Sequence, residues 1–186
     1  MIETHRLILR PFAEQDADDL YEYLSQPMVN CFACMHLTDP AQGAEALSKR
    51  SKNPELCFAI VHKDTGKVIG EIEAMAESAA PEECGRPADT FSPCWLLNRD
   101  FRGQGFVTEA AHAFFAYLFR EKGARRIYAY TEEDNISSQK VCEKLGMRRE
   151  GRFVEFVTFV NHPDGTPRYE TTLQYAILKR EWEETP

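Results

Sequence analysis

The stretch Arg102-Gly103-Gln104-Gly105-Phe106-Val107-Thr108-Glu109 joins two different apolar patterns. The short run Cys94-Trp95-Leu96-Leu97 before it is typical of a buried strand, and the Ala-rich run 110–119 after it is long enough for a helix. A glycine-containing loop is therefore expected to lead from a strand into the N-terminus of a helix. Backbone N–H groups at that position lack helical partners, and the helix dipole favours an anion there.

The residues of this loop indicate a phosphate site. Gly103 and Gly105 lack the Cβ atoms that would hold a phosphate away from the backbone, and Arg102 adds a permanent positive charge. The loop is not a Walker loop, because no Gly-Lys-Ser/Thr follows, and Thr108 stands where the dinucleotide fingerprint has its third Gly or Ala. We predict a site for the pyrophosphate of a nucleotide-derived cofactor. A strand-to-helix turn without a ligand is the alternative that the loop alone leaves open.

Length and composition narrow the class of protein. A chain of 186 residues fits a single domain over residues 1–186 with a sizeable core. No apolar run is long enough to span a membrane and the first residues are polar, so we expect a cytoplasmic protein with no membrane partner. A formal net charge of −8 disfavours a nucleic-acid partner.

The cysteines suggest neither a disulfide framework nor a metal centre. The six cysteines follow no framework-like spacing, so thiols in a reducing compartment are expected. Cys31 and Cys34 are not accompanied by a second pair at metal-ligand spacing. We therefore expect no metal site.

Apolar periodicity and turn residues predict the order of the elements. Strands are expected at 6–10, 57–61, 68–75, 94–97, 126–131, 148–160 and 170–178, helices at 16–24, 40–51, 110–122 and 135–145, and a long loop at 77–90. The strand–helix–strand unit around the loop implies a parallel strand pair, and the hairpins imply antiparallel pairs. The expected fold is an α/β, mixed and mostly antiparallel sheet with a central parallel strand pair and helices on both faces.

Two separated motifs resemble those of GNAT (Gcn5-related) N-acetyltransferases. Residues 102–107 resemble the family's Gln/Arg-x-x-Gly-x-Gly/Ala loop, which cradles the pyrophosphate of coenzyme A. Residues 135–147 resemble the second motif, Asn-x-x-Ser/Ala followed by Glu-Lys-Leu-Gly-Phe. Residues 3–10 and 175–182 resemble the subgroup that contains the Rim-type ribosomal-protein N-terminal acetyltransferases. The resemblance extends over essentially the whole chain.

This resemblance implies direct transfer of the acetyl group of acetyl-CoA to a primary amine, with no metal. The acceptor stays open between a protein N-terminus and a small-molecule amine. The sequence does not specify the oligomeric state, although dimers are common among the relatives and a homodimer is one assembly to consider.

Two positions depart from the family pattern. Val107 stands where the first motif ends in Gly or Ala, and Cys142 stands where many members carry a Tyr that protonates the leaving thiolate. These departures support one alternative, a non-catalytic acyl-CoA-binding or sensing protein on the same fold. An interaction module that binds no acetyl-CoA is a second alternative.

The reaction that the resemblance implies requires three groups. The amine must lose a proton, the developing oxyanion needs a hydrogen-bond donor, and the departing thiolate takes up a proton. Glu71 and Glu73 are the base candidates, since residues two apart share one face of a strand; a solvated strand face is the alternative. The resemblance places the oxyanion donor among the backbone N–H groups near Leu96 or Leu97, and Ser138 near the sulfur, where its hydroxyl can donate to the thiolate.

The remaining site predictions concern the cofactor and the acceptor. Asn135 is expected to cap its helix and to face the cofactor, and Glu109 to compensate the dipole of its helix. The segment 31–36 is expected to border the acceptor site, with Phe32, Met35 and His36 shaping it. The predicted donor-binding residues are Leu96, Leu97, Arg102, Gly103, Gln104, Gly105, Phe106, Val107, Thr108, Asn135 and Ser138, and the predicted catalytic residues are Glu71, Glu73 and Ser138.

Overall fold

The structure is a computed structural model that describes residues 1–78 and 84–183, and the chain divides into two compact units. The first unit comprises Met1–Glu73 and Trp95–Ala113. The second comprises Ala74–Cys94 and Phe114–Pro186.

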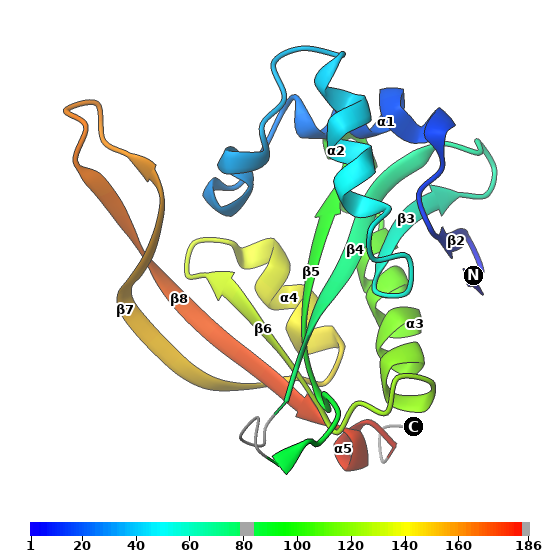
Figure 1. The fold of residues 1–186 in the computed structure, drawn as a ribbon. Helices are drawn as coiled ribbons and strands as arrows, with labels where there is room; N and C mark the ends of the chain where they lie inside the picture. The colour runs from blue at the N-terminus through cyan, green and yellow to red at the C-terminus, as the bar shows by residue number, and fades with distance from the viewer. Residues whose placement is uncertain (79–83, 184–186) are drawn as a thin grey trace. The chain divides into compact units, whose positions relative to one another are not determined.

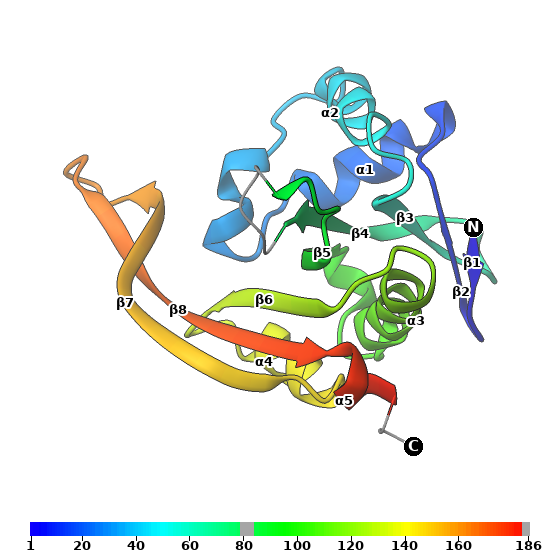
Figure 2. The same ribbon diagram turned by 60° about the horizontal axis from the view of Figure 1, so that its bottom comes forward.

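Figures 1 and 2 label the α-helices and strands of the chain. The elements in chain order are β1 (Ile2–Glu3), β2 (Leu7–Arg10), η1 (Glu14–Asp16), α1 (Ala17–Leu24), η2 (Asn30–Met35), α2 (Gln42–Arg50), β3 (Cys57–His62), β4 (Val68–Glu77), β5 (Thr90–Leu97), η4 (Arg99–Phe101), α3 (Phe106–Arg120), β6 (Arg126–Glu132), α4 (Ile136–Lys144), β7 (Arg148–Asn161), β8 (Pro167–Leu178) and α5 (Lys179–Glu183). Strands β4 and β5 and helix α3 each run from one unit into the other.

Antiparallel ladders build the first unit. Strand β2 pairs with β1 and with β3, and β3 pairs with β4 in a register that sets Cys57 opposite Glu73. The turn between β3 and β4 contains Gly66, whose φ of +70° suits glycine. The apolar face of α1 packs into a core with β3, and Leu20 and Leu24 there are almost completely buried. Because β3 is paired with β4, this packing also fixes β4, the strand that carries Glu71 and Glu73.

Helices α1 and α2 lie side by side in the first unit (Figures 1 and 2). Gly43 of α2 permits this close packing, since a Cβ at that position would lie 2.9 Å from the carbonyl oxygen of Ala17. Helix α2 begins at Gln42, two residues later than expected. The carboxylate of Asp39 accepts a hydrogen bond from the Ala41 N–H at 2.9 Å, which forms a turn before the helix instead of its cap.

The second unit contains the parallel pair. Strand β5 runs parallel to β6, with Thr90 opposite Arg126, while β8 pairs antiparallel with both β6 and β7. Strands β7 and β8 form the long twisted hairpin in Figure 2. The core of this unit includes Phe115 and Phe119 of α3, whose rings lie 6.0 and 5.7 Å from that of Trp182.

The topology confirms the expected fold class. The eight strands follow the order β1-β2-β3-β4-β5-β6-β8-β7 in a mixed, mostly antiparallel sheet with the parallel pair β5–β6. Among the described residues, no helix combines the length and apolar character needed to cross a membrane.

Element boundaries differ from the expected ones where local signals conflict. Strand β5 starts at Thr90 rather than Cys94, although Pro93 lacks the N–H that a strand ladder uses. Strand β8 starts at Pro167 rather than Glu170, because pairing with β7 extends it. The segment expected to be irregular contains the 3₁₀ helix η2. Part of the long loop expected at 77–90 lies outside the described residues, which end at 78 and resume at 84.

Candidate active site

The glycine loop connects η4 to the N-terminus of α3 in the first unit. Gly103 and Gly105 have φ values of +74° and +82°, in the left-handed region that glycine adopts without steric cost. The N–H of Glu109 donates to the Gly105 carbonyl at 3.0 Å, as in the first turn of a helix. The backbone N–H groups of residues 106–108 therefore precede the first helical hydrogen bond of α3.

The geometry of this loop fits a pyrophosphate. A Cβ built on Gly103 meets no atom within 4 Å, so the space beside the loop is open. The side chains of Arg102 and Gln104 are exposed, whereas Phe106 is only 3% exposed and packs against His62 and Phe101. Backbone N–H groups and the positive end of the helix dipole can face a bound anion here, and the guanidinium of Arg102, which lies 3.3 Å from Met28 Sδ, adds a positive charge. Val107 is partly buried at the start of the helix.

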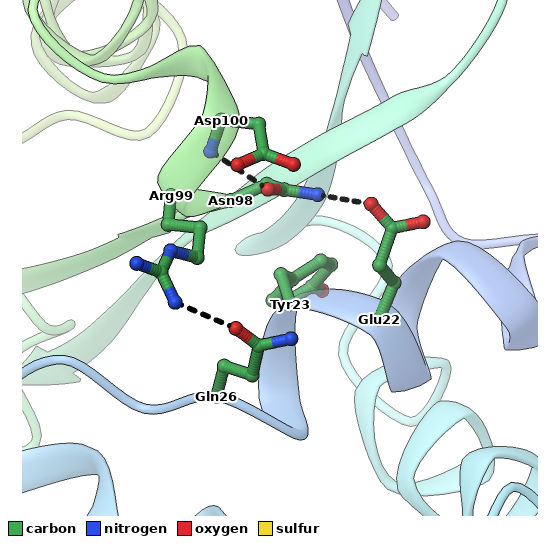
Figure 3. A pocket seen from close by; sticks show the side chains of 6 residues that line it. All are labelled: Glu22, Tyr23, Gln26, Asn98, Arg99 and Asp100. Carbon is green, nitrogen blue, oxygen red and sulfur yellow. Dashed lines mark hydrogen bonds between the residues drawn. The ribbon is translucent and has the colours of Figure 1, made fainter.

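A polar pocket lies just before the loop in the chain, still within the first unit (Figure 3). It has a volume of about 230 Å³ and is lined by Glu22, Tyr23, Gln26, Asn98, Arg99 and Asp100. The Asn98 amide donates to the Glu22 carboxylate at 2.8 Å, and Arg99 donates to the Gln26 amide oxygen at 2.8 Å. Glu22 also binds Lys67 at 2.6 Å; the hydrogen bonds from Lys67 and Asn98 hold the pKa of Glu22 below its ordinary value. These side chains can hydrogen-bond a polar ligand, and the sequence patterns did not identify the pocket.

Glu71, on β4, is held in a buried ion pair. Its carboxylate is only 3% exposed and accepts hydrogen bonds from Arg50 and, at 2.7 Å, from the hydroxyl of Tyr23. Burial and the charge of Glu71 raise the pKa of Tyr23 well above its ordinary value, which keeps this phenol a neutral donor. Both carboxylate oxygens of Glu71 therefore have hydrogen-bond donors, Oε1 from Arg50 and Oε2 from Arg50 and Tyr23.

Glu73 lies two residues further along β4 and is less enclosed. Its side chain is partly exposed, and the Cys57 thiol across the ladder is hydrogen-bonded to it. Burial and the negative charge of Glu71 raise the pKa of Glu73 above its ordinary value, with Arg50 and Cys57 acting in the opposite direction. A raised pKa increases the affinity of the Glu73 carboxylate for a proton, as a general base requires.

Strands β4 and β5 approach each other closely at Gly70. A Cβ there would lie 2.2 Å from the carbonyl oxygen of Leu96, and the Asn98 N–H donates to the Ile69 carbonyl at 2.7 Å. Leu96 and Leu97 are partly exposed at the end of β5, directly before η4 and the loop. The structure thus places in one unit the base candidates, the two leucines and the glycine loop.

The predicted residues of the second motif lie in the second unit. Asn135 caps α4, its side-chain oxygen accepting from the Ser138 N–H at 3.2 Å, as expected. Ser138 is partly exposed in the first turn of this helix. Cys142 is completely buried, and this burial raises the pKa of its thiol to about 12. Cys142 is therefore a core thiol rather than a substitute for the missing Tyr.

The segment expected to border the acceptor site is ordered by local bonds. His36 Nε2 lies 3.0 Å from the Ser25 carbonyl, and Met35 packs against the core of the first unit. The polar pocket is lined by other residues than these. Within residues 1–78 and 84–183, no cluster of three His, Cys, Asp or Glu side chains is arranged to hold a metal ion.

Comparison with known proteins identifies the family. The family described as acetyltransferase (GNAT) domain matches residues 6–148. The uncharacterized N-acetyltransferase YnaD of Bacillus subtilis (strain 168) is 29% identical over 181 residues, which cover 97% of this chain and 98% of that protein.

Solved structures agree with this result. The crystal structure of a GNAT-family acetyltransferase from Bacillus anthracis is 26% identical, with a TM-score of 0.80 over 96% of this chain and 98% of that one. RimL, a ribosomal L7/L12 alpha-N-protein acetyltransferase solved with coenzyme A, shares the fold at 15% identity, with a TM-score of 0.72 over 94% of this chain and 95% of that one. The chain therefore belongs to the GNAT family of acetyl-CoA-dependent N-acetyltransferases.

Proposed function

We propose that this protein transfers the acetyl group of acetyl-CoA to a primary amine, using the loop 102–108 to hold the donor and Glu73 to take the amine proton. The observation that carries the proposal is the pair of left-handed glycines at the N-terminus of α3, beside the exposed Arg102. Bound acetyl-CoA supplies a thioester whose acetyl carbon accepts the lone pair of the amine nitrogen.

Glu73 is proposed as the base because Glu71 is already paired. An ammonium group has no lone pair, so the base must remove a proton before or during attack. The raised pKa of Glu73 means that its carboxylate binds a proton more strongly than an ordinary Glu, which favours proton transfer from the ammonium group. Glu71 then serves to keep negative charge beside Glu73 and to fix β4 through Arg50 and Tyr23.

Roles in the reaction are also proposed for three further groups. A backbone N–H near Leu96 or Leu97 donates to the developing oxyanion, and Asn135 and Ser138 contribute to donor binding. The hydroxyl of Ser138 donates a hydrogen bond to the departing thiolate. Ser138 is a better candidate for this role than Cys142, because Ser138 is partly exposed whereas Cys142 is completely buried.

The acceptor, the domain organisation, the cellular location and the assembly are also proposals. The fold shared with RimL, named for an alpha-N-protein target, supports a protein N-terminus as the first acceptor to test, with small-molecule amines second. The family match runs through both units, which supports one working domain over the whole chain. We propose a cytoplasmic enzyme that works without nucleic acid or membrane, and a homodimer is the assembly to test.

The test is an assay of coenzyme A release with a panel of peptides bearing different N-termini and a panel of small amines. We expect release with at least one amine, and a loss of kcat of about 10²-fold or more in Glu73→Gln. Glu45→Gln is the matched control, since Glu45 is an exposed residue of α2 that forms an ion pair with Lys49. Full activity of Glu73→Gln would reject the assignment of the base. Tight acetyl-CoA binding with no release from any amine would reject the enzyme in favour of an acyl-CoA sensor.

A further inference from the structure

Arg6, immediately before β2, contacts the glycine loop from the side of the N-terminal strands. Its Nη1 donates to the carbonyl oxygen of Gln104 at 2.9 Å, and its guanidinium lies 4.3 Å from the ring centroid of Phe106. A Cβ on Gly105 would lie 3.6 Å from Nη2 of the same side chain. One guanidinium therefore contacts Gln104 and Phe106 and lies beside the glycine between them.

Glu109 fixes the orientation of that guanidinium. Its carboxylate accepts from the Arg6 Nε at 2.7 Å, from the Arg6 N–H at 2.8 Å and from the Thr4 hydroxyl at 2.6 Å. Burial opposes ionisation, but the bonds from Thr4 and Arg6 together hold the pKa of Glu109 below its ordinary value. The charge of Arg6 is thus balanced, and its effect on the loop is mainly geometric.

The backbone of Arg6 is itself anchored to the strands of the first unit. The Lys63 N–H donates to the Arg6 carbonyl at 3.0 Å, and the next residue, Leu7, begins the ladder with β3. The Arg6 side chain therefore extends from a fixed backbone to the loop.

The bond to Gln104 sets the direction of one peptide group. In a planar trans peptide the carbonyl oxygen and the following N–H point in opposite directions. Because the Gln104 carbonyl faces Arg6, the Gly105 N–H faces away from it. Glycine has the freest backbone of all residues, so loss of this bond would let the peptide between Gln104 and Gly105 rotate, and its N–H would no longer be preorganised.

We infer that Arg6 is a positioning residue for donor binding, which holds the 104–105 peptide so that the loop presents its N–H groups to the pyrophosphate of acetyl-CoA. The inference rests on the proposed function of the loop. It makes the N-terminal strand region, remote in sequence from the motif, part of the donor-binding machinery.

The test compares the affinities for acetyl-CoA and for acetyl-pantetheine, a donor fragment without the pyrophosphate, by calorimetry on the full chain. In Arg6→Ala we expect the dissociation constant for acetyl-CoA to rise about tenfold, as for the loss of one charge-assisted hydrogen bond, and that for acetyl-pantetheine to stay unchanged. If Arg6 has only a structural role, Arg6→Ala should raise the dissociation constants for both ligands by the same factor. That result would overturn the inference.

Two further variants separate binding from folding. Arg6→Lys keeps a charge beside Glu109, but its single ammonium cannot replace the forked contacts to both Glu109 and Gln104. It should therefore recover stability without recovering acetyl-CoA affinity. Arg10→Ala is the matched control, because Arg10 ends β2 and its guanidinium is engaged in an ion pair with Asp16 at 2.6 Å. This variant should lower stability and leave both affinities unchanged.

The outcomes also distinguish the inference from the proposed function. If the wild-type protein binds acetyl-CoA no better than acetyl-pantetheine, the loop does not hold a pyrophosphate and the proposed function of the loop fails. If the wild type prefers acetyl-CoA and Arg6→Ala and Arg6→Lys keep that preference in full, only the positioning role of Arg6 is rejected.

Discussion

At the scale of single residues, Glu71 on β4 is paired with Arg50, and this pairing is the reason for proposing Glu73 as the base. Both side chains are buried, so removing one charge leaves the other uncompensated. We predict that Glu71→Gln lowers the free energy of unfolding by about 3–5 kcal/mol, measured by urea denaturation. The double variant Glu71→Met/Arg50→Met should recover most of that loss, because it removes both charges. A single variant as stable as the wild type would show that the pair contributes nothing.

The raised pKa of Glu73 has a consequence for the pH profile of the reaction. Only the carboxylate form can accept a proton, so kcat/KM should fall as the pH decreases through the raised pKa. We predict that the acidic limb lies above the ordinary pKa of 4.5, and that Cys57→Ala moves it to still higher pH, since the Cys57 thiol stabilises the carboxylate. The measurement is kcat/KM against pH for both proteins. A limb at or below 4.5 would contradict the assignment of Glu73.

The sequence identified single residues unequally well. The sequence was enough to place Gly103 and Gly105 in a loop before a helix and Asn135 at a helix cap, because turns and helix ends have local residue preferences. The partners of the carboxylates could not, because Arg50 is 21 residues away from Glu71 in the chain, and Arg6 is 103 residues away from Glu109. No periodicity connects such pairs, and only the assembled strands bring them together.

At the scale of elements, the loop before α3 is strained for any residue but glycine. We predict that Gly103→Ala lowers stability by about 1–2 kcal/mol and also weakens acetyl-CoA binding, measured by thermal denaturation and by calorimetry. Gly66→Ala is the matched control, because Gly66 has a similar φ of +70° and equally open surroundings, in the turn between β3 and β4. It should show the same loss of stability with unchanged affinity. Equal affinities of the two variants would contradict the phosphate role of the loop.

Elements with strong local signals were predicted well, and their ends less well. Helix α4 and the hairpin β3–β4 lie within a few residues of their expected bounds, because capping residues and a turn mark them. The starts of β5 and β8 were misplaced, since ladder pairing with strands distant in sequence extends them beyond their apolar cores. The start of α2 was misplaced because the side chain of Asp39 binds within its own turn.

At the scale of the whole molecule, the order of strands and the family membership were predictable, whereas the acceptor was not. A strand–helix–strand unit with a glycine loop allows few topologies, and the parallel pair β5–β6 is the one expected. The polar pocket, for example, is lined by side chains from segments far apart in the chain, near α1 and after β5. Periodicity and short motifs carry no information on such a surface.

The most direct test of the central claim is calorimetric titration of the full chain with acetyl-CoA, beside Arg102→Ala and the control Arg99→Ala. Arg99 is an exposed neighbour on η4, bonded to Gln26. We predict saturable binding by the wild type and by Arg99→Ala, and at least about tenfold weaker binding by Arg102→Ala, the loss of one charge-assisted contact to a phosphate. No binding at millimolar acetyl-CoA, or equal affinities of the three proteins, would contradict the account.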